Sequence, residues 1–388
     1  MRIAVYGGSF NPPHRGHTEA ARTVVRELRP DRFLIVPANI PPHKALAEDS
    51  PTAEQRMELC RLAFSEIPEC EISDIELRRE GKSYTYDTVQ ELRGEYPDAE
   101  ICLVVGTDML ESFEEWYHFR FLLENCTLAV LARTEDDGDA LREKAGQMES
   151  EYGAKILVLR HEPLEASSEL IRERLPLRAG EDLLCESVYA EIIRRRFYGA
   201  KPELTWLREK ALDLLDEARV AHVAGCESEA VNLARHWGED PELAAEAAIL
   251  HDITKRCGRD QQLQLCEKYG IIIDNSEKEN YRLLHARTGA AVAHELFGAE
   301  ETVCEAIRWH TTGKPDMTQF EKILYLADYI EPTRDFEGVE ELRKLAYEDL
   351  DRAMALGLKM TIDVVRSEGR EVYVDTLNAY EWYNEKEK

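Results

Sequence analysis

The chain of 388 residues lacks long apolar runs, paired cysteines and an excess of positive charge. No apolar run approaches the ~20 residues that a membrane-spanning helix needs, and the N-terminus lacks the long apolar stretch of a signal peptide. Its nine cysteines include no CxxC pair, which disfavours a disulfide framework or a zinc ribbon. We therefore expect a cytoplasmic protein with reduced thiols and no membrane partner.

The deficit of positive charge extends over both halves of the chain. Lysine and arginine number 49 against 77 aspartates and glutamates, a formal charge of −28. Residues 1–198 contain 25 basic and 38 acidic residues (−13), and residues 199–388 contain 24 and 39 (−15). Such a surface repels a phosphate backbone, so we expect no nucleic-acid partner. Small anionic ligands can still bind at sites where local hydrogen-bond donors outweigh the repulsion by the overall negative charge.

Two secondary-structure patterns divide the chain near residue 200. Up to that point β-rich runs alternate with helical patterns, which predicts a parallel sheet covered by helices. The expected strands are 2–6, 33–36, 100–105, 127–131 and 155–159. Residues 197–202 look like a short linker, and residues 204–385 read as amphipathic helix. We therefore expect an α/β domain over 1–198 and an all-α domain over 199–388, whose helices break at Gly238, Gly258, Gly270, Gly298 and Gly313.

The first expected strand runs into GGSFNPPHRGH, residues 7–17. Ligands of open α/β sheets bind at the carboxyl ends of strands, where the next helix offers N–H groups and a partial positive charge. Gly7 and Gly8 let the main chain approach a phosphate. His14 and His17 fall on one face of the entering helix and can donate to oxygens whose charge grows as a bond breaks. The pattern favours a polyphosphate cradle over a turn with surface histidines.

This run resembles the (H/T)xGH signature of the nucleotidyltransferase superfamily, and its longer form is similar to bacterial nicotinate-nucleotide adenylyltransferases. Further landmarks follow in that family's order: PPHK at 41–44, QRM at 55–57, SYTYDT at 83–88, VGTDM at 105–109, Trp116 and SSELIR at 167–172. The resemblance covers about residues 1–195 and implies an α/β Rossmann-like nucleotidyltransferase domain with helices on both faces of the sheet. The sequence departs from the family pattern at Ala166 and Glu169.

The resemblance also implies roles for individual residues, with Mg²⁺ as the cofactor of adenylyl transfer. The implied catalytic groups are His14, His17, Lys44 and Arg172. The implied ATP contacts are Gly7, Gly8, Ser9, Phe10, His14, His17, Gly106, Asp108, Ser168, Ile171 and Arg172. Nicotinate mononucleotide would contact Lys44, Thr85, Asp108 and Trp116. Plainer alternatives are core packing for Trp116 and helix capping for Asp108.

The second half contains the pair His251-Asp252 in an apolar stretch that reads as helix over residues 244–255. Such a dipeptide is common by chance and means little alone. It is accompanied by further polar residues beside apolar ones on or at the ends of expected helices: His222, His285, His310 and Asp328. A polar side chain that faces a core must be paired or bind a metal. The set favours a metal site over four separate core histidines.

The order H…HD…H…H…D resembles the HD-domain phosphohydrolase superfamily, and the phrases HDITK, HTTG and LADYIEPTR are similar to symmetrical diadenosine tetraphosphate hydrolases. The resemblance covers about residues 204–380. It implies one metal surrounded by His222, His251, Asp252 and Asp328, and a second held by Asp252, His285 and His310. Imidazole with carboxylate suits iron, manganese or zinc rather than calcium or magnesium, and we expect two such ions, with iron favoured.

Four other residues of this half complete the prediction. Lys255 lies three residues after Asp252, where it would neutralise a polyphosphate as a catalytic group, and Arg334 would add a weaker contact. His236 and His294 match no motif and are expected to be structural.

Together the resemblances imply a bifunctional enzyme of NAD biosynthesis and dinucleotide hydrolysis. The first domain would transfer AMP from ATP to nicotinate mononucleotide, giving nicotinic acid adenine dinucleotide and pyrophosphate. The second would hydrolyse diadenosine tetraphosphate symmetrically to two ADP. Two alternatives stay open: another acceptor for the first domain, such as phosphopantetheine or a glycerol phosphate, and a second domain that senses nucleotides or hydrolyses another one. A homo-oligomer is compatible with the sequence.

Overall fold

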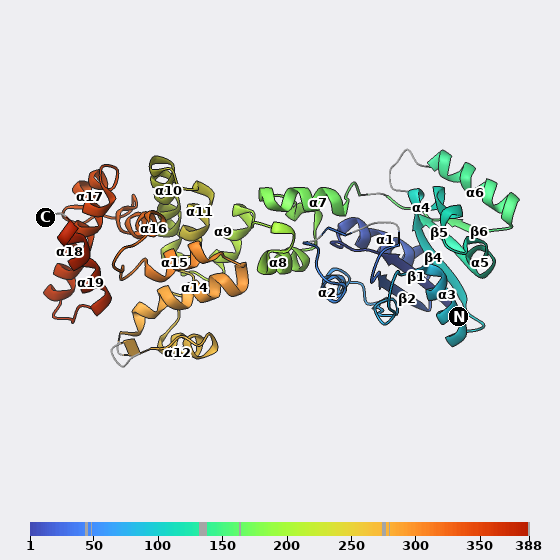
Figure 1. Cartoon of the computed structure of the whole chain (residues 1–388), viewed down its shortest axis with the longest axis horizontal. Helices are drawn as coiled ribbons and strands as arrows, with labels where there is room; N and C mark the ends of the chain where they lie inside the picture. The colour runs from blue at the N-terminus through green and yellow to red at the C-terminus, as the bar shows by residue number, and fades with distance from the viewer. Residues whose placement is uncertain are drawn as a thin grey trace. The chain divides into compact units, whose positions relative to one another are not determined.

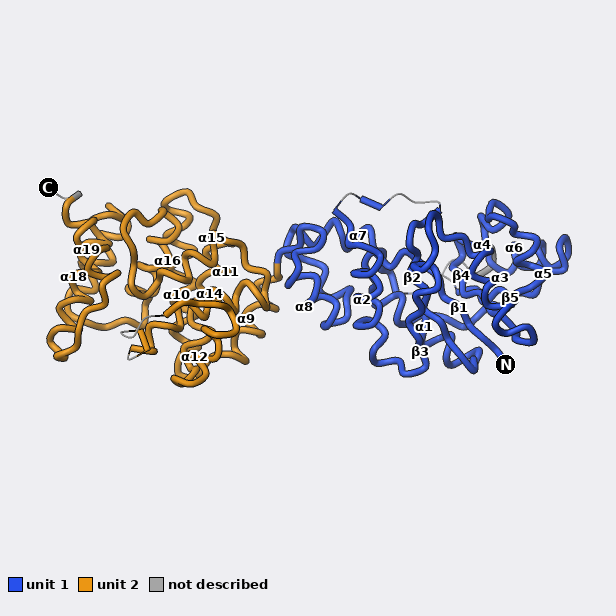
Figure 2. Tube along the Cα trace, turned by 60° about the horizontal axis from the view of Figure 1, so that its bottom comes forward, with its two compact units in different colours: residues 1–201 blue, residues 202–388 orange. Residues whose placement is uncertain are grey.

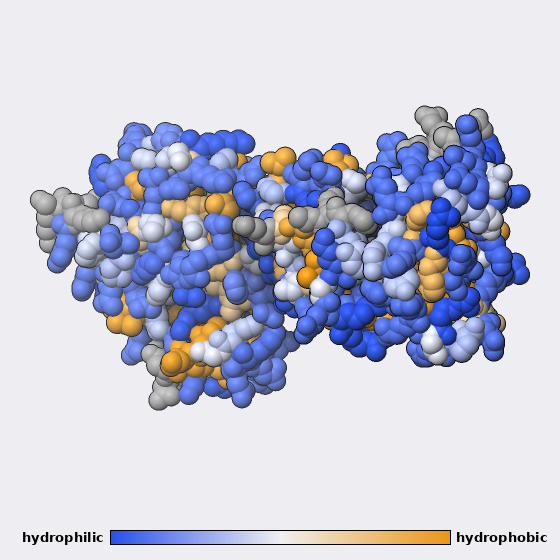
Figure 3. All heavy atoms as spheres, turned by 45° about the vertical axis from the view of Figure 1, so that its right-hand side comes forward, coloured by the Kyte–Doolittle hydropathy of each residue, from blue (hydrophilic) through white to orange (hydrophobic). Residues whose placement is uncertain are grey.

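The computed structural model describes residues 1–42, 46–47, 49–131, 138–162, 164–273, 277–278 and 280–386. The chain divides into two compact units, Met1–Lys201 and Pro202–Lys388 (Figure 2). Most of the segment expected as a linker is folded into unit 1: Tyr198 is buried, and its hydroxyl donates to Oδ1 of Asn11 at 2.7 Å. None of the described helices is long and apolar enough to cross a membrane. The face drawn in Figure 3 is mainly hydrophilic, with scattered apolar patches.

Unit 1 is built on a six-stranded parallel sheet in the order β3-β2-β1-β4-β5-β6 (Figure 1). The strands are β1 Arg2–Gly8, β2 Arg32–Pro37, β3 Cys70–Ile72, β4 Glu100–Gly106, β5 Cys126–Leu131 and β6 Lys155–Val158. The α-helices are α1 Arg15–Leu28, α2 Ala53–Ala63, α3 Thr85–Glu95, α4 Thr107–Glu111, α5 Phe119–Asn125, α6 Gly138–Tyr152, α7 Ser168–Arg174 and α8 Glu186–Arg195. This architecture confirms the Rossmann-like α/β class predicted from the sequence.

The apolar runs of the central strands follow from their burial, since a parallel sheet is covered on both faces. All six residues of β5 are buried. The short strand β3 was not predicted, because its three residues, with Glu71 in the centre, are partly or fully exposed and give no apolar signal. It pairs with β2 at the edge of the sheet.

The strand order reverses between β1 and β4, and this places the ligand-binding edge of the sheet. Gly8 at the end of β1 lies opposite Pro37 at the end of β2, and β4 ends close by at Gly106. Open α/β sheets bind ligands in the crevice outside the carboxyl ends of strands at such a reversal. The predicted motif at residues 7–17 begins at this point.

The described residues of unit 2 form helices and turns only, which confirms the all-α prediction. The α-helices are α9 Leu204–Leu212, α10 Val220–Trp237, α11 Pro241–Leu250, α12 Arg259–Lys268, α14 Leu284–Phe297, α15 Glu301–Trp309, α16 Gln319–Ile330, α17 Val339–Ala346, α18 Leu350–Ser367 and α19 Val374–Lys386. Eight of the 12 residues of α16 are buried, and this helix packs against α10, α15 and α18. The predicted breaks are confirmed at Gly238 and Gly298, which end α10 and α14, and at Gly258, which precedes α12.

One predicted helix is wrong in its extent. Residues 244–255 read as a single helix, whereas α11 ends at Leu250 and residues 251–256 form turns. The N–H groups of Ile253 and Lys255 bond to the carbonyls of Leu250 and Asp252, three residues earlier, at 3.4 and 2.9 Å. These short-range bonds replace the helical ladder, so His251 and Asp252 project from a turn.

Candidate active sites

The predicted polyphosphate cradle joins the end of β1 to the start of α1. His14 immediately precedes α1, and its main-chain N–H donates to Nδ1 of His17 at 3.1 Å. The two imidazole rings lie with their centroids 3.7 Å apart. Because Nδ1 of a neutral His17 accepts this bond, its Nε2 carries the ring proton and is a donor. A donor next to a helix N-terminus is suited to an anionic oxygen.

Small and apolar residues hold these two rings in place. A Cβ added to Gly16 would lie 3.1 Å from the ring of His14, closer than ordinary van der Waals contact, which explains the glycine between the histidines. Phe10 is only 1% exposed, and its ring contacts that of His17 edge-on, with centroids 5.0 Å apart. Phe10 therefore packs behind His17, and its contact with ATP stays a prediction.

The start of α7 lies against the same loop, as the predicted pairing of the two motifs requires. Oγ of Ser168 donates to the carbonyl of Pro12 at 2.8 Å, and the guanidinium of Arg172 donates to the carbonyl of Asn11 at 2.7 Å. Ile171 is fully buried behind them. The structure thus brings Ser168 and Arg172 next to the histidine loop. Glu169 is exposed.

A cavity of about 210 Å³ opens between the ends of β1 and β4. Its lining includes Gly7, Gly8, Ser9, Thr85 and Trp116. The indole of Trp116 stacks on Phe113, with centroids 4.8 Å apart, so it packs on the core and borders the cavity at the same time. Asp108 is exposed in the first turn of α4, which begins after Gly106. Lys44 lies outside the described residues.

Sequence reasoning assigned no site role to two buried charged residues beside this cavity. Arg56 is 1% exposed and donates to the carbonyls of Ser9, Ala38 and Asn39 at 2.6, 2.7 and 3.0 Å. It ties the loop after β1 to the loop after β2, and burial lowers the pKa of its guanidinium. The QRM motif, which contains Arg56, is a landmark of the family in the sequence, but the sequence alone indicates no contact for this arginine.

Glu76 lines the cavity itself. Burial raises the pKa of its carboxyl, and the hydroxyl of Thr88 donates to it at 2.8 Å. No sequence signal distinguished it from the surrounding acidic residues.

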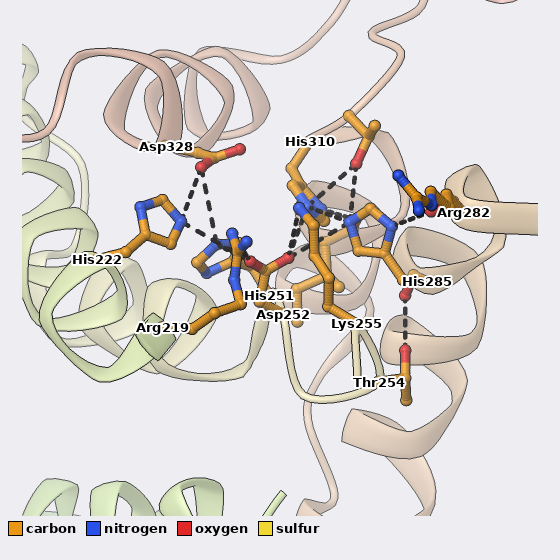
Figure 4. A network of polar contacts seen from close by, with 12 residues as sticks. Arg219, His222, His251, Asp252, Thr254, Lys255, Arg282, His285, His310 and Asp328 are labelled. Carbon is orange, nitrogen blue, oxygen red and sulfur yellow. Dashed lines mark hydrogen bonds and ion pairs between the residues drawn. The ribbon is translucent and has the colours of Figure 1, made fainter. Parts of the chain in front are cut away.

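Six side chains from five parts of unit 2 converge on one centre (Figure 4). They are His222 from α10, His251 and Asp252 from the turn after α11, His285 from α14, His310 from the residue after α15, and Asp328 from α16. All except Asp328 are less than a tenth exposed. The structure therefore brings together every residue that the sequence proposed for the metal site.

Asp252 lies between two pairs of histidines. Its Oδ2 is 3.7 Å from Nε2 of His222 and 3.4 Å from Nε2 of His251. Its Oδ1 is 3.3 Å from Nε2 of His285 and 3.6 Å from Nε2 of His310. Each carboxylate oxygen thus faces a different pair of ring nitrogens, as a carboxylate shared by two metal positions would.

Ring orientation in this centre is set by hydrogen bonds on the far side of each imidazole. Nδ1 of three histidines lies 2.5–2.6 Å from a main-chain carbonyl three residues earlier: His251 and Ala248, His285 and Arg282, His310 and Ile307. A carbonyl can only accept, so Nδ1 carries the proton and Nε2 presents its lone pair to the centre. This is the arrangement of metal-binding histidines, which usually donate their second N–H to a carbonyl or carboxylate.

The protonation of the centre also fits metal ligation. Burial lowers the pKa of His285 to about 4 and lowers that of His310, so both rings are neutral near pH 7. Burial alone would also lower the pKa of His251, but the carboxylates of Asp252 and Asp328 raise it, so a metal ion would have to displace a proton from this ring at low pH. Burial alone would raise the pKa of Asp252, but His251 and the other imidazoles hold it well below its usual range. Neutral imidazoles and an ionised carboxylate are the forms that bind metals.

Some buried nitrogen and oxygen atoms of this centre form no hydrogen bond in the part of the chain that the structure describes, which is a further indication that the centre suits a metal ion. Nε2 of His222, Nε2 of His251 and both carboxylate oxygens of Asp252 are buried and form no hydrogen bond with the described residues. Two overlapping groups have ligand atoms within 4.8 Å of one another: His222, His251 and Asp328, and His251, Asp252 and His310. Arg219 and Lys255 pair with the Asp252 oxygens, but the buried imidazole nitrogens that face them still need a partner, and a metal ion would supply one.

Three cationic side chains border the carboxylates of the centre. Lys255 places Nζ 3.2 Å from Oδ1 of Asp252, and Arg334 donates to Oδ1 of Asp328 at 2.8 Å. Both lie beside the centre, and their predicted contact with a polyphosphate stays a prediction. Arg219 contacts Oδ2 of Asp252 and was not predicted. It stands three residues before His222, a spacing that could have placed it on the same side. All three are partly exposed, so they connect the centre to solvent.

The two histidines set aside as structural have other partners. Nε2 of His236 lies 2.8 Å from the carbonyl of Tyr347, and Nδ1 of His294 lies 3.1 Å from the carbonyl of Ala299. They lie near the ends of α10 and α14, where such bonds fix a helix terminus.

Fold and site geometry together define two classes: a Rossmann-like nucleotidyltransferase unit and an all-helical HD-type unit with a His/Asp cluster suited to divalent metal. Comparison with known families agrees, since residues 5–174 match the cytidylyltransferase-like family and residues 219–333 match the HD domain.

Individual relatives have names that give a particular activity, which the family descriptions do not. A protein of Bacillus subtilis named "Bis(5'-nucleosyl)-tetraphosphatase, symmetrical" is 37% identical over 45% of this chain and 96% of its own length. A protein of Lachnoclostridium phytofermentans named "Probable nicotinate-nucleotide adenylyltransferase" is 32% identical over 51% of this chain and 98% of its own length. The chain therefore belongs to the nicotinate-nucleotide adenylyltransferase family in its first half and to the symmetrical bis(5'-nucleosyl)-tetraphosphatase family in its second half.

One further relative matches both halves of the chain. A Mycoplasma pneumoniae protein named "Probable nicotinate-nucleotide adenylyltransferase/Ap4A hydrolase" is 24% identical over 92% of this chain and 97% of its own length.

Proposed function

We propose that the chain is a bifunctional enzyme, which makes nicotinic acid adenine dinucleotide with residues 1–198 and hydrolyses diadenosine tetraphosphate with residues 199–388. The observation that carries the proposal is that each unit holds a chemically distinct site built from its own residues. Relatives named for the single activities each match one half, and a relative named for both matches nearly the whole chain.

In the first reaction the 5′-phosphate oxygen of nicotinate mononucleotide attacks the α-phosphorus of ATP. A new P–O bond forms there, the bond to the β-phosphate oxygen breaks, and pyrophosphate leaves with its electron pair. The step needs positioning and charge stabilisation but no covalent nucleophile. His14 and His17 bind the phosphates from one side, and Ser168 and Arg172 bind them from the other, with Lys44 as a further contact.

Other groups complete the ATP site. Mg²⁺ is the proposed cofactor, since it neutralises triphosphate charge when bound. The remaining proposed contacts to ATP are the main chain of Gly7, Gly8, Ser9, Phe10, Gly106 and Ile171, together with Asp108 for a ribose hydroxyl.

The acceptor occupies the cavity between β1 and β4. Thr85, at the first position of α3, and the main chain near Trp116 would receive the nicotinate carboxylate. The indole would stack on the pyridine, because a flat aromatic face is the best partner for a flat heterocycle. Lys44 and Asp108 would contact the rest of the mononucleotide.

In the second reaction water adds to a phosphorus of the tetraphosphate and the central phosphoanhydride bond breaks, so that two ADP leave. His222, His251, Asp252 and Asp328 would hold one metal ion, and Asp252, His285 and His310 would hold the second. Bound metals supply Lewis-acid stabilisation of phosphoryl oxygens and lower the pKa of water. Transition-metal ions are the proposed metals, because a nitrogen-rich donor set with carboxylates favours them over Mg²⁺ or Ca²⁺. Among them iron is the one that the resemblance to symmetrical diadenosine tetraphosphate hydrolases favours.

The cations around the centre would bind the substrate's phosphates. Lys255, Arg219 and Arg334 lie at the carboxylates and reach toward solvent, so each can contact a polyphosphate that enters. Their positive charge offsets the acidic surroundings, which would otherwise repel a tetraphosphate. We place the protein in the cytoplasm, where its nine free cysteines would stay reduced.

Product analysis of the purified chain tests both halves of the proposal. One incubation contains ATP, Mg²⁺ and nicotinate mononucleotide, and the other contains diadenosine tetraphosphate with Fe²⁺ under anaerobic conditions. Chromatography should show nicotinic acid adenine dinucleotide in the first and ADP as sole product in the second. AMP with ATP from the second incubation would contradict symmetrical cleavage, and phosphopantetheine as the better acceptor would contradict the first assignment.

A further inference from the structure

The four histidines of the metal centre differ in what they bond on their far side. Three of them donate Nδ1–H to a main-chain carbonyl of their own segment. Nδ1 of His222 instead lies 3.1 Å from a carboxylate oxygen, Oε1 of Glu331. This acceptor comes from a segment 109 residues away and carries a negative charge. Glu331 belongs to the LADYIEPTR phrase, but no role was predicted for it.

Glu331 is held firmly in its position. It follows the last residue of α16 and is fully buried. The N–H of Thr333 donates to Oε2 at 2.7 Å, the hydroxyl of Thr333 donates to Oε1, and the guanidinium of Arg334 lies 3.6 Å from Oε1. Such donors compensate a buried carboxylate for lost water.

The neighbouring helix is shaped to admit this carboxylate. Gly225 lies in α10, three residues after His222, and a Cβ there would collide with Oε2 of Glu331. The glycine thus permits the close approach that lets Glu331 reach the ring of His222.

A charged acceptor has a defined effect on a metal-binding imidazole. It fixes the tautomer, as a carbonyl does, but it also draws the Nδ1 proton toward itself and makes Nε2 a stronger electron donor. Nε2 of His222 faces Oδ1 of Asp328 at 3.1 Å and Oδ2 of Asp252 at 3.7 Å. Only this side of the centre has a carboxylate-backed histidine among the described residues.

We propose that Glu331 is a positioning residue of the metal centre. It orients His222 and strengthens it as a ligand of the position formed by His222, His251, Asp252 and Asp328. This position then binds metal more tightly than the position formed by Asp252, His285 and His310. The inference rests on the proposed metal site but does not depend on which nucleotide the site hydrolyses.

Metal titration of the full-length chain tests this without any substrate. Metal-free wild type, Glu331→Gln and Glu331→Ala are titrated with Mn²⁺, and bound ions per chain are measured by elemental analysis after equilibrium dialysis. Gln keeps an acceptor for Nδ1–H and loses the charge, whereas Ala loses both. We expect wild type to bind two ions with unequal affinity. The tighter position should weaken about 10-fold in Gln and about 100-fold in Ala, with the weaker position unchanged.

A matched variant separates this role from a structural one. Glu321 is a buried glutamate of α16, the helix that Glu331 follows, and its carboxylate caps the start of α16 and pairs with Lys314 at 2.7 Å. Glu321→Gln should leave both metal affinities unchanged, whatever it does to the melting temperature. The weaker metal position lies in the same unit, so its unchanged affinity reports in each variant that unit 2 is otherwise intact.

Three results with the variants would overturn the inference. They are unchanged metal binding in Glu331→Gln and Glu331→Ala, equal weakening of both positions, and weakening in Glu321→Gln as large as in Glu331→Gln. Two bound ions of unequal affinity in wild type, without hydrolysis of diadenosine tetraphosphate, would instead contradict the proposed substrate and leave the role of Glu331 standing. A wild type that binds no metal would overturn both.

Discussion

The two units differ in how the residues of their sites are distributed along the sequence. Unit 1 uses a continuous stretch, residues 7–17, whose main chain, helix start and two histidines lie together because they are neighbours in sequence. Unit 2 uses side chains spread from His222 to Asp328, which meet only because five segments pack around one centre. The histidine loop of the first site is therefore fixed mainly by local conformation, although Ser168 and Arg172 reach it from α7, whereas the whole metal centre is fixed by tertiary packing.

This difference predicts how each site responds to damage. A cradle of donors loses strength in proportion to the donor removed, since the others remain in place. A buried cluster that shares one carboxylate loses its ions together when that carboxylate is removed. The predictions below use this contrast, starting with the largest effect.

Asp252→Ala should lower hydrolysis of diadenosine tetraphosphate by on the order of 10³-fold or more and strip most metal from the chain. Each oxygen of Asp252 faces its own pair of histidines, so its loss affects both positions. Metal content per chain and ADP release are the measurements. Asp363→Ala, at an exposed aspartate of α18, serves as the control.

His310→Ala sharpens the same test, because this residue lies on one side of Asp252 only. It should empty mainly one position and leave the other partly filled. His236→Ala, which removes a histidine bonded to Tyr347 away from the centre, should keep the full metal content. An Asp252→Ala variant with full metal and activity would contradict the shared-carboxylate account.

His17→Ala should lower the turnover of adenylyl transfer by about 10²-fold, since it removes one donor to charge that develops in the transition state. Hydrolysis by unit 2 should be unchanged. The control is His161→Ala, a half-buried histidine of unit 1 that contacts Thr23 rather than the cradle. If hydrolysis fell in parallel, the two sites would not be independent.

Acceptor choice is the next test, with an expected effect of at least 10-fold. If Thr85 and the main chain near Trp116 bind a carboxylate, nicotinate mononucleotide should have a higher kcat/KM than its amide. A pocket built to bond one group rejects the analogue that leaves its donors unpaired. Initial rates with both mononucleotides measure this, and equal kcat/KM values would remove the assignment of Thr85.

The smallest expected effect is on substrate affinity in unit 2. Arg219→Ala should raise the KM for diadenosine tetraphosphate about 10-fold, because a phosphate contact is lost while all six proposed metal ligands remain. Metal content should stay at the wild-type level. A loss of metal in Arg219→Ala would show that the arginine supports Asp252 instead of the substrate.

Features that depend on local conformation could be predicted from the sequence, and features that depend on tertiary packing could not. The Rossmann-like class and the loop at 7–17 could be read from apolar runs and a contiguous motif, while β3 could not, because its three residues carry no apolar signal. The set of metal ligands was found from a spaced pattern. Its geometry was not, since it depends on the turn after Leu250 that the helix prediction missed.

Supporting residues were the hardest to predict, and for a physical reason. Arg56 bonds to carbonyls of two loops, and Glu331 bonds to a ring 109 residues away, so both roles exist only after the chain has folded. Their burial distinguishes them from the many other charged residues of the chain. Sequence periodicity alone does not reveal which charged residue will be enclosed.

Independence of the two sites is the central claim, and one chelation experiment tests it most directly. The purified chain is assayed for both reactions in excess Mg²⁺, with and without phenanthroline, which binds transition metals in preference to Mg²⁺. The account predicts that ADP release from diadenosine tetraphosphate stops and returns when Fe²⁺ is restored, while synthesis of nicotinic acid adenine dinucleotide continues at its original rate. Hydrolysis that persists in the chelator, or adenylyl transfer that stops with it, would contradict the account.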